Sequence, residues 1–253
     1  MNDINRIIKE RQDKIMAQIA ASGLAGQVFP ELSKIRIQQK LKNNTGQYVF
    51  NIKDPNVDNI VTFSLDRNDV FIPNLWGVRI VLKNTVTGEL RAFTFAPRYD
   101  GVAPSIHQVG FTTAGADAMY DGSVQWILDN NVAMSAYPME YFKKVPETQG
   151  LFVLDSNDAA VQEGIQLEHD INDDLNLLYS KYQICGTRDH KITVLFDAAG
   201  KSFTLASQAA SGDDVTANWE PYVELIMLGF LVKGGCQTPA NGKNPFGKAA
   251  GQW

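Results

Sequence analysis

The apolar residues of this chain change their spacing near residue 33, from a helical repeat to the repeat of two that is typical of β-strands. Residues 34–41 (KIRIQQKL) and 47–53 (QYVFNIK) alternate apolar and polar side chains, and the Asn/Gly-rich residues 43–46 separate them. Such alternation places the apolar side chains on one face of a strand, where they can be buried. We therefore predict a hairpin over residues 33–53 and an antiparallel, mainly β fold.

The same pattern recurs along the rest of the chain. A second hairpin is predicted with its turn at Thr87-Gly88, a third with its turn at Asp197–Gly200, and a further strand at residues 60–65. Residues 221–233 (PYVELIMLGFLVK) are a long apolar run that predicts a strand, with a buried helix as the alternative. A helical turn is predicted near Ser123–Leu128. This number of strands favours a sandwich or a barrel.

Two segments keep a helical repeat. Residues 2–22 carry isoleucines at helical spacing and are followed by Gly23, a common residue at helix ends. Residues 157–182 carry a second apolar stripe with acidic residues on the other side, and Asp155 and Asn157 supply N-terminal caps. The sequence thus predicts an N-terminal amphipathic helix and one helix inserted into the β fold.

Four basic residues of the N-terminal helix lie mostly away from its isoleucine stripe: Arg6, Lys9, Arg11 and Lys14. A basic amphipathic helix can lie on an anionic membrane or contact nucleic acid. Three acidic residues reduce the net charge of the segment to +1, four basic minus three acidic. Packing against the protein's own sheet or that of a neighbouring subunit is the alternative. We interpret the four basic residues as a contact surface for membrane or genome.

The C-terminal residues 233–253 form a segment that cannot build a core of its own. Five glycines and two prolines interrupt it, and it carries three lysines and no acidic residue. Helices and strands both tolerate such a composition poorly. We therefore predict an extended arm that contacts a neighbouring subunit. Phe246 and Trp253 would anchor it, and Lys243 and Lys248 would pair with an acidic surface such as that of the predicted helix 157–182.

The length of 253 residues suits one large β-domain or two small ones. We divide the chain into residues 1–32 (helix and linker), 33–154 (first β region), 155–232 (acidic helix and second β region) and 233–253 (arm). The two cysteines, Cys185 and Cys236, form no CxxC motif, so neither a disulfide framework nor a zinc site is expected, and a reducing compartment is the default. Without a signal-peptide or membrane-spanning pattern, we expect assembly in the cytoplasm.

The sequence contains no catalytic or phosphate-binding motif of the types G-x-S-x-G, H-E-x-x-H or G-x-x-x-x-G-K-[ST]. His107 lies in loop-like sequence, and His190, just before a predicted strand, is most simply a turn residue. His169 with Asp173 is at most half a metal site. The segment DPNVD places Asp54, Asn56 and Asp58 at alternate positions, as calcium loops do, but it lacks the glycine and glutamate that an EF-hand needs. A turn between strands explains these residues better. We expect neither enzymatic activity nor a bound cofactor or metal.

Aromatic residues beside turns are the strongest functional signal. They include Trp76 and Trp219, and side chains of this type concentrate at protein interfaces because they bury a large area at low entropic cost. Trp76, Trp126 or Trp219, if exposed, would instead favour a sugar-binding platform. Packing at the bases of loops is the structural alternative. These residues leave open an interface function and a carbohydrate- or receptor-binding β-sandwich module.

The layout of leading amphipathic helix, β body, inserted helix and Gly/Pro/Lys-rich arm resembles that of the jelly-roll major capsid proteins of small tailless icosahedral bacteriophages. The resemblance implies a jelly-roll-type antiparallel β-sandwich, either a compact double roll or a single embellished one. It further implies a virion structural protein, a coat subunit assembled in the host cytoplasm. Its partners would be copies of itself, in a trimer or larger shell, and other virion proteins. The chain has fewer predicted strands than a double roll needs.

Overall fold

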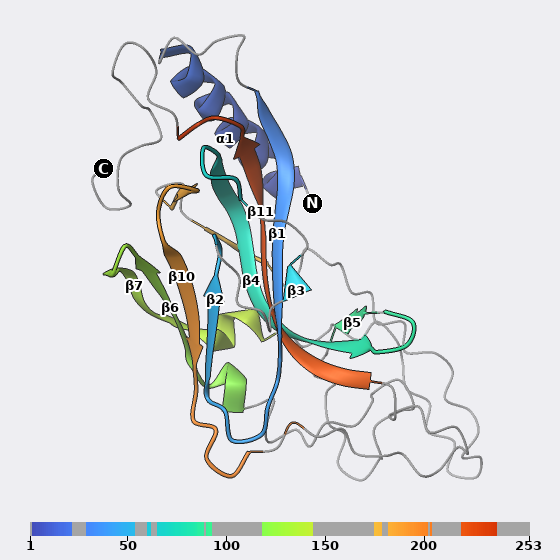
Figure 1. Cartoon of the computed structure of the whole chain (residues 1–253). Helices are drawn as coiled ribbons and strands as arrows, with labels where there is room; N and C mark the ends of the chain where they lie inside the picture. Colours follow the sequence, from blue (N-terminus) through green and yellow to red (C-terminus); the bar gives the residue numbers. More distant parts are fainter. Residues whose placement is uncertain are drawn as a thin grey trace, which may run out of the picture.

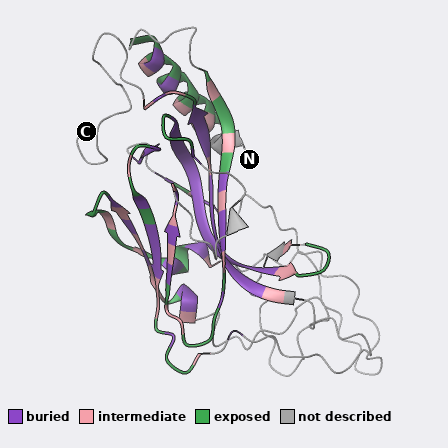
Figure 2. Ribbon diagram, viewed as in Figure 1, coloured by how far each residue is buried: buried purple, intermediate pink, exposed green. Residues whose placement is uncertain are grey.

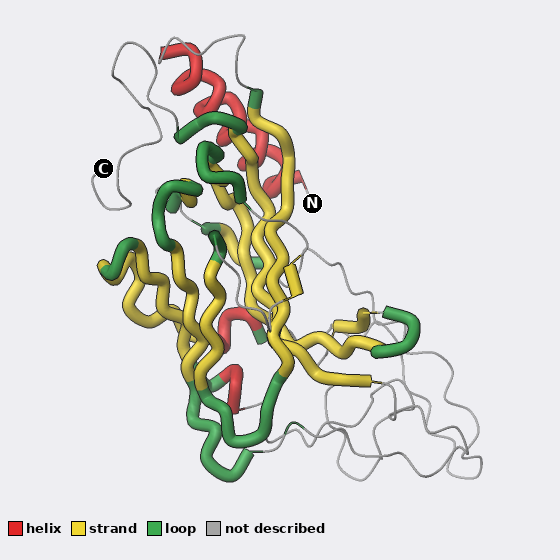
Figure 3. Tube along the Cα trace, in the orientation of Figure 1, coloured by secondary structure: helices red, strands yellow, loops and turns green. Residues whose placement is uncertain are grey.

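The computed structural model describes residues 2–21, 29–53, 60–61, 65–88, 90–92, 118–143, 175–178, 182–201, 203 and 219–236. This part of the chain is dominated by strands, which form two antiparallel sheets (Figures 1 and 3). The prediction of a mainly β, antiparallel fold is therefore confirmed. The helix α1 (Asn2–Ala21) lies at one end of the larger sheet, and the short 3₁₀ helix η1 (Met139–Phe142) follows the smaller one.

The described strands divide unequally between the sheets. The larger sheet has the order β3-β1-β11-β4-β5, and β8 and β9 also pair with β4. Its strands are β1 (Pro30–Lys40), β3 (Ile60–Val61), β4 (Val70–Asn84), β5 (Leu90–Ala92), β8 (Asn176–Leu177), β9 (Ile184–Cys185) and β11 (Trp219–Val232). The smaller sheet has the order β2-β10-β6-β7. Its strands are β2 (Gln47–Asn51), β6 (Ser123–Leu128), β7 (Asn131–Pro138) and β10 (His190–Leu195).

The main hydrophobic core lies between the two sheets, whose facing sides are buried (Figure 2). Alternation of apolar and polar residues provides the side chains of this core, because every second side chain of a strand points to the same face. In β6 the alternate residues Val124, Trp126 and Leu128 are buried, and the residues between them are partly exposed. The same rule places apolar side chains of several strands in this core: Ile35, Ile37, Phe50, Val78, Ile80, Ile192, Val194, Val223 and Leu225.

The predicted hairpin over residues 33–53 is wrong, although both strands and the turn are present. β1 pairs with β11 along its whole length, from Pro30 opposite Val232 to Lys40 opposite Tyr222. β2 instead pairs with β10 in the other sheet. The turn between them, with Asn44 at a positive φ of 57°, therefore carries the chain from one sheet to the other. Alternation identifies the buried face of a strand but not its partner.

Four other local predictions can be compared with the structure. The hairpin of β4 and β5 is confirmed, with Val81 opposite Ala92, and residues 219–232 form a strand and not a helix. Ser123–Leu128 is a strand, so the helical turn predicted there is wrong. The predicted helix 157–182 is wrong at its C-terminal end, because residues 176–177 form β8. Leu175 and Leu178, spaced as on one helical face, belong to different apolar clusters on opposite faces of the larger sheet.

β4 and β11, the two longest neighbouring strands of the larger sheet, contain a bulge. The register shifts between Leu228, opposite Leu75, and Gly229, opposite Pro73, so that Asn74 has no partner position. A bulge explains how a proline can occupy a central strand, since Pro73 has no N–H to offer the ladder. Gly229 completes the arrangement, because β4 passes so close that a Cβ atom there would lie 2.1 Å from the Ile72 carbonyl oxygen.

We predict that Gly229→Ala lowers the free energy of unfolding by about 2.5 kcal/mol, because the added methyl group meets backbone that cannot move independently of the sheet. The matched control is Gly200→Ala, where a Cβ atom would meet nothing within 4 Å and only the positive φ of 69° opposes the change. That control should lose about 1 kcal/mol. Urea denaturation of both variants measures the difference, and equal losses would contradict the close approach of β4.

Candidate functional site

α1 covers the outer face of the larger sheet at the end where β11 finishes (Figure 1). Ile15 and Ile19 are buried, with 4% and 1% of their surface exposed, and Ile8 packs beside them. The residues that they contact belong to β4, β9 and β11: Val70, Ile72, Cys185, Phe230 and Val232. The isoleucine stripe of the helix therefore packs against the protein's own sheet, which is the alternative considered from the sequence. No helix in the described ranges is both long and apolar enough to span a bilayer.

The four basic residues of α1 do not share one environment. Arg11 is half-buried and donates from Nη1 to the backbone oxygen and the Oδ1 atom of Asn74, at 3.0 and 3.2 Å. Its partial burial lowers the pKa of the guanidinium. Arg6, Lys9 and Lys14 are exposed, and Arg6 lies 3.9 Å from Glu10. Arg11 thus holds the helix to the bulge of β4, and the other three basic residues lie at the surface.

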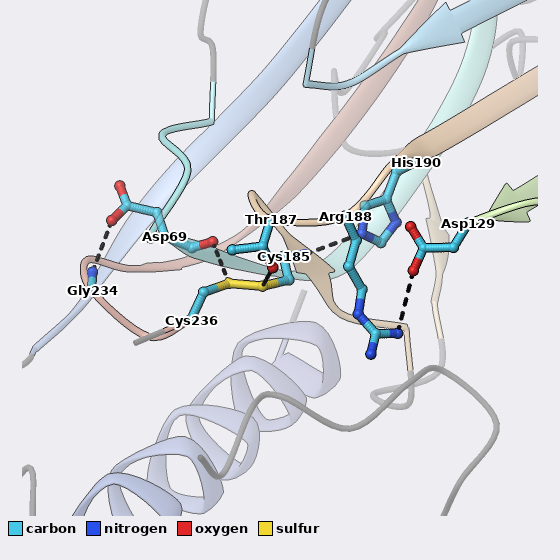
Figure 4. Close-up of a disulfide and its surroundings, with 8 residues drawn as sticks. All are labelled: Asp69, Asp129, Cys185, Thr187, Arg188, His190, Gly234 and Cys236. Atoms are coloured by element: carbon cyan, nitrogen blue, oxygen red, sulfur yellow. Dashed lines mark hydrogen bonds and ion pairs between the residues drawn. A yellow bond between two sulfur atoms is a disulfide. The ribbon is translucent and has the colours of Figure 1, made fainter. Parts of the chain in front are cut away.

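A disulfide joins Cys185 of β9 to Cys236, four residues after the end of β11 (Figure 4). The two Cα atoms are 6.0 Å apart and the residues are separated by 51 positions in the sequence. No disulfide framework was expected from the sequence, and this bond between the chain's two cysteines corrects that expectation. The pairing is not visible in the sequence because β9 and β11 approach one another only through β4, with which both pair.

Residues of the segment before β4 hold the two cysteines in place. Cys236 donates its backbone N–H to the Asn68 oxygen at 2.8 Å, and Gly234 donates its N–H to Asp69 Oδ1 at 2.8 Å. On the other side, Gly186 donates to the Asp69 backbone oxygen at 2.9 Å. The Cys236 sulfur also lies 3.0 Å from this oxygen, and the Cys185 sulfur lies 3.0 Å from Thr187 Oγ1 (Figure 4). Asp69 therefore bridges both halves of the disulfide region.

His190, at the start of β10, supports Cys185 from the side of the smaller sheet. Its Nε2 accepts the backbone N–H of Cys185 at 3.2 Å, so the neutral ring carries its proton on Nδ1, which has no hydrogen-bond partner within the described part of the chain. Burial lowers the pKa of His190 to about 4 and outweighs the charge of Asp129. Asp129 in turn lies 3.7 Å from Arg188 (Figure 4). The histidine predicted to be a turn residue is a buried, neutral acceptor.

A second polar cluster lies midway along the outer face of the larger sheet. Glu224 of β11 is fully buried and stands directly opposite Arg79 of β4, whose Nε donates to Oε1 at 2.9 Å. Arg36 of β1 donates to Oε2, and Gln38 donates to the same oxygen at 2.5 Å. This cluster was not predicted from the sequence, although a single acidic and a single basic residue in the middle of two long apolar strands are a signal that could have revealed it.

The structure describes the side chains of two of the three tryptophans considered for a sugar-binding platform. Trp76 and Trp126 are fully buried in the main core, Trp76 against Phe142 and Trp126 stacked on Tyr182. They do not form an exposed platform. The side chain of Trp219 lies outside the described residues. The following predicted site residues also lie outside them: Asp54, Asn56, Asp58, His107, His169, Asp173, Lys243, Phe246, Lys248 and Trp253.

The described residues contain no group of three or more His, Cys, Asp or Glu side chains that could hold a metal ion. Comparison with protein-family models, with curated proteins and with solved structures finds no match. Function therefore has to be inferred from the chain's own residues. Two features of the described residues bear on function. One is the order of the strands, and the other is the end of the sandwich that carries α1, the disulfide and residues 233–236.

Proposed function

We propose that this chain is a single jelly roll that serves as the coat subunit of a viral shell. The observation that supports it is a nested set of strand pairings. Eight strands follow one another as β1, β2, β4, β6, β7, β8 with β9, β10 and β11. The first pairs with the last, the second with the seventh, the third with the sixth and the fourth with the fifth.

Such nesting is what results when a long hairpin is folded from its middle and then rolled into a sandwich. Rolling brings the third strand beside the last and the fourth beside the seventh, and β4 pairs with β11 and β6 with β10 accordingly. Double-sheet jelly rolls of eight strands occur in viral capsids and lectins. β3 and β5 are short additions at the sides of the larger sheet.

The coat function is favoured over the lectin-like alternative by two features of the molecule. Trp76 and Trp126 are core residues and offer nothing to a sugar ring. The larger sheet also carries α1 on its outer face, and Cys236, the fourth residue of the segment 233–253, packs against the apolar cluster under this helix. A shell subunit needs complementary surfaces and connecting segments, and it needs no active site. In this proposal the partners are further copies of the chain, and Lys243, Phe246, Lys248 and Trp253 contact a neighbour in the virion.

The mass of the protein in solution tests this function, by light scattering with electron microscopy of the same sample. We expect the full chain to form oligomers or shells, and a variant ending at Cys236 to lose them, because that end point retains β11 and the disulfide. The double variant Lys243→Glu/Lys248→Glu should weaken assembly. Its matched control, Lys42→Glu/Lys191→Glu, changes the same charge at exposed positions of the sandwich and should leave assembly intact.

A full chain that remains a monomer at all concentrations would overturn the coat proposal. Glycan binding by that monomer would then support the alternative, a carbohydrate- or receptor-binding module. Assembly that survives both the truncation and the charge reversal would retain a shell function but remove residues 237–253 from the interface.

A further inference from the structure

We propose that the Cys185–Cys236 disulfide is a reversible clasp, open in a reducing cytoplasm and closed after oxidation, that fixes the start of the C-terminal segment to the sandwich. This inference rests on the proposed function for its biological setting but not for its chemistry. A coat subunit made in cytoplasm meets glutathione, which keeps most protein thiols reduced, and a released particle does not. A reversible bond requires that this site be stable in both redox states.

Both sulfur atoms have hydrogen-bond partners that suit the dithiol form. The Cys236 sulfur lies 3.0 Å from the backbone oxygen of Asp69, a group that can only accept a hydrogen bond. A disulfide sulfur has no proton to donate to it, whereas a thiol has. The Cys185 sulfur lies 3.0 Å from Thr187 Oγ1, which can donate to it or accept from it. Reduction therefore leaves neither sulfur without a polar partner.

The two cysteines are held near each other by contacts that do not involve the S–S bond. The backbone N–H of Cys236 is bound to Asn68, that of Gly234 to Asp69, and that of Cys185 to His190. β9 also pairs with β4, with Cys185 opposite Val70. Opening the bond leaves this framework in place, so the thiols stay close enough for the bond to form again. Such a site favours reversible chemistry without unfolding.

The bond lies where it can influence both terminal segments. Cys185 belongs to the apolar cluster under α1, with Cys236 packed against it, and Cys236 ends the turn 233–236 that follows β11. Cys236 is only half-buried, whereas Cys185 is 7% exposed, so an external thiol reaches the Cys236 sulfur first. With the bond closed, the turn cannot separate from the sandwich unless β9 moves with it. With the bond open, separation is opposed only by weaker contacts: the hydrogen bonds of the turn, the packing of Cys236 and the Lys233–Glu31 ion pair.

The exchange is balanced with glutathione as the second reactant. A glutathione thiolate attacks the Cys236 sulfur, the S–S bond breaks, and Cys185 leaves as a thiolate that takes a proton from water. A second glutathione thiolate attacks the glutathione sulfur of the mixed disulfide, and Cys236 leaves as a thiolate that also takes a proton from water. The two glutathiones depart joined as oxidised glutathione, having given two electrons to the protein. The protein disulfide thus gains two electrons and two protons. Closing reverses these steps, with oxidised glutathione as the oxidant.

The experiment uses the full chain equilibrated in buffers with different ratios of reduced to oxidised glutathione. Free thiols are alkylated and counted by intact mass, far-UV and near-UV circular dichroism report folding, and trypsin cleavage after Lys233 reports opening of the turn. Cleavage after Lys42, an exposed residue distant in sequence, is the internal control. The double variant Cys185→Ser/Cys236→Ser serves as a permanent dithiol analogue, because each serine hydroxyl keeps a partner.

We expect both thiols to appear together and reversibly with unchanged circular dichroism. Cleavage after Lys233 should rise about tenfold in the reduced protein and in the double serine variant, while cleavage after Lys42 stays constant, because only the local opening has become easier. A bond that stays closed at a cytosolic excess of reduced glutathione would overturn the clasp. So would global unfolding on reduction, or unchanged cleavage after Lys233. None of these readouts depends on assembly, so failure of the clasp and failure of the coat function are distinguishable.

Discussion

Glu224→Gln is expected to lower the free energy of unfolding by about 3–5 kcal/mol, the range found when one partner of a buried ion pair is removed. The carboxylate is fully buried and accepts hydrogen bonds from Arg36, Gln38 and Arg79, which come from the two strands on either side of β11. Glutamine keeps the size and one acceptor oxygen but removes the negative charge. The two guanidinium groups are then left in a site with little water to screen them.

Glu220→Gln is the matched control for this prediction, because Glu220 lies on the same strand and pairs with a lysine of β1. Its carboxylate is 2.5 Å from the Lys40 ammonium, but the two side chains are 32% and 48% exposed. Solvent screens such pairs, so the expected loss is below about 1 kcal/mol. Urea denaturation at neutral pH compares the two variants. Similar small losses would mean that the Glu224 cluster is accessible to water in solution.

Acidification from pH 7 to pH 4 is expected to remove about 3 kcal/mol of stability through His190 alone. The pKa of the imidazole is about 6.5 in an unfolded chain and about 4 in the folded protein, where the ring is buried. Below pH 6.5 the unfolded chain takes up a proton that the folded protein refuses. Stability is therefore fully present above about pH 6.5, falls as the pH approaches 4, and changes no further through this residue below that value.

The variant His190→Gln isolates this contribution. A glutamine amide oxygen can accept the Cys185 N–H as Nε2 does, but it does not titrate. From pH 7 to pH 4 the unfolding free energy of the unsubstituted protein should fall by about 3 kcal/mol relative to that of the variant. Urea denaturation of both proteins at several pH values measures this change. The other two histidines are present in both proteins, so their contributions cancel in the comparison. A difference that stays constant with pH would show that His190 is not buried as a neutral ring.

The sequence predicts the class of the fold well, because period-two alternation is a local property. It identifies the strands at 34–41, 47–53 and 221–233 and the helix at 2–22, and each appears with small changes in its ends. The same local pattern does not identify which strand each strand pairs with. β1 and β2 look like a hairpin because only a short segment with the Asn/Gly-rich residues 43–46 separates them in the sequence. Their apolar faces are instead buried against each other across the core, so the two strands lie in opposite sheets.

The functional features were harder to predict, because each depends on contacts between residues distant in sequence. Cys185 and Cys236 meet through their common neighbour β4, and Glu224 meets Arg79 and Arg36 only once the register of three strands is set. Helical spacing indicated the stripe of α1 correctly, but it could not show that Arg11 bonds to Asn74. The bulge that places Asn74 within reach of Arg11 depends on Pro73 and Gly229 lying opposite each other. That pairing cannot be seen until the register of β4 and β11 is known.

The pairing of β1 with β11 also determines when the protein can fold during its synthesis. β11 is a central strand of the larger sheet, flanked by β1 and β4, and almost 200 residues lie between its start and the start of β1 (Pro30 to Trp219). Until residues 219–232 have left the ribosome, β1 and β4 lack the strand that joins them. Such long-range pairing slows folding and leaves strand edges exposed to other nascent chains. We therefore expect the folded surfaces to form late and in one step. If the protein is the coat subunit proposed above, incomplete chains would then be kept out of the assembly.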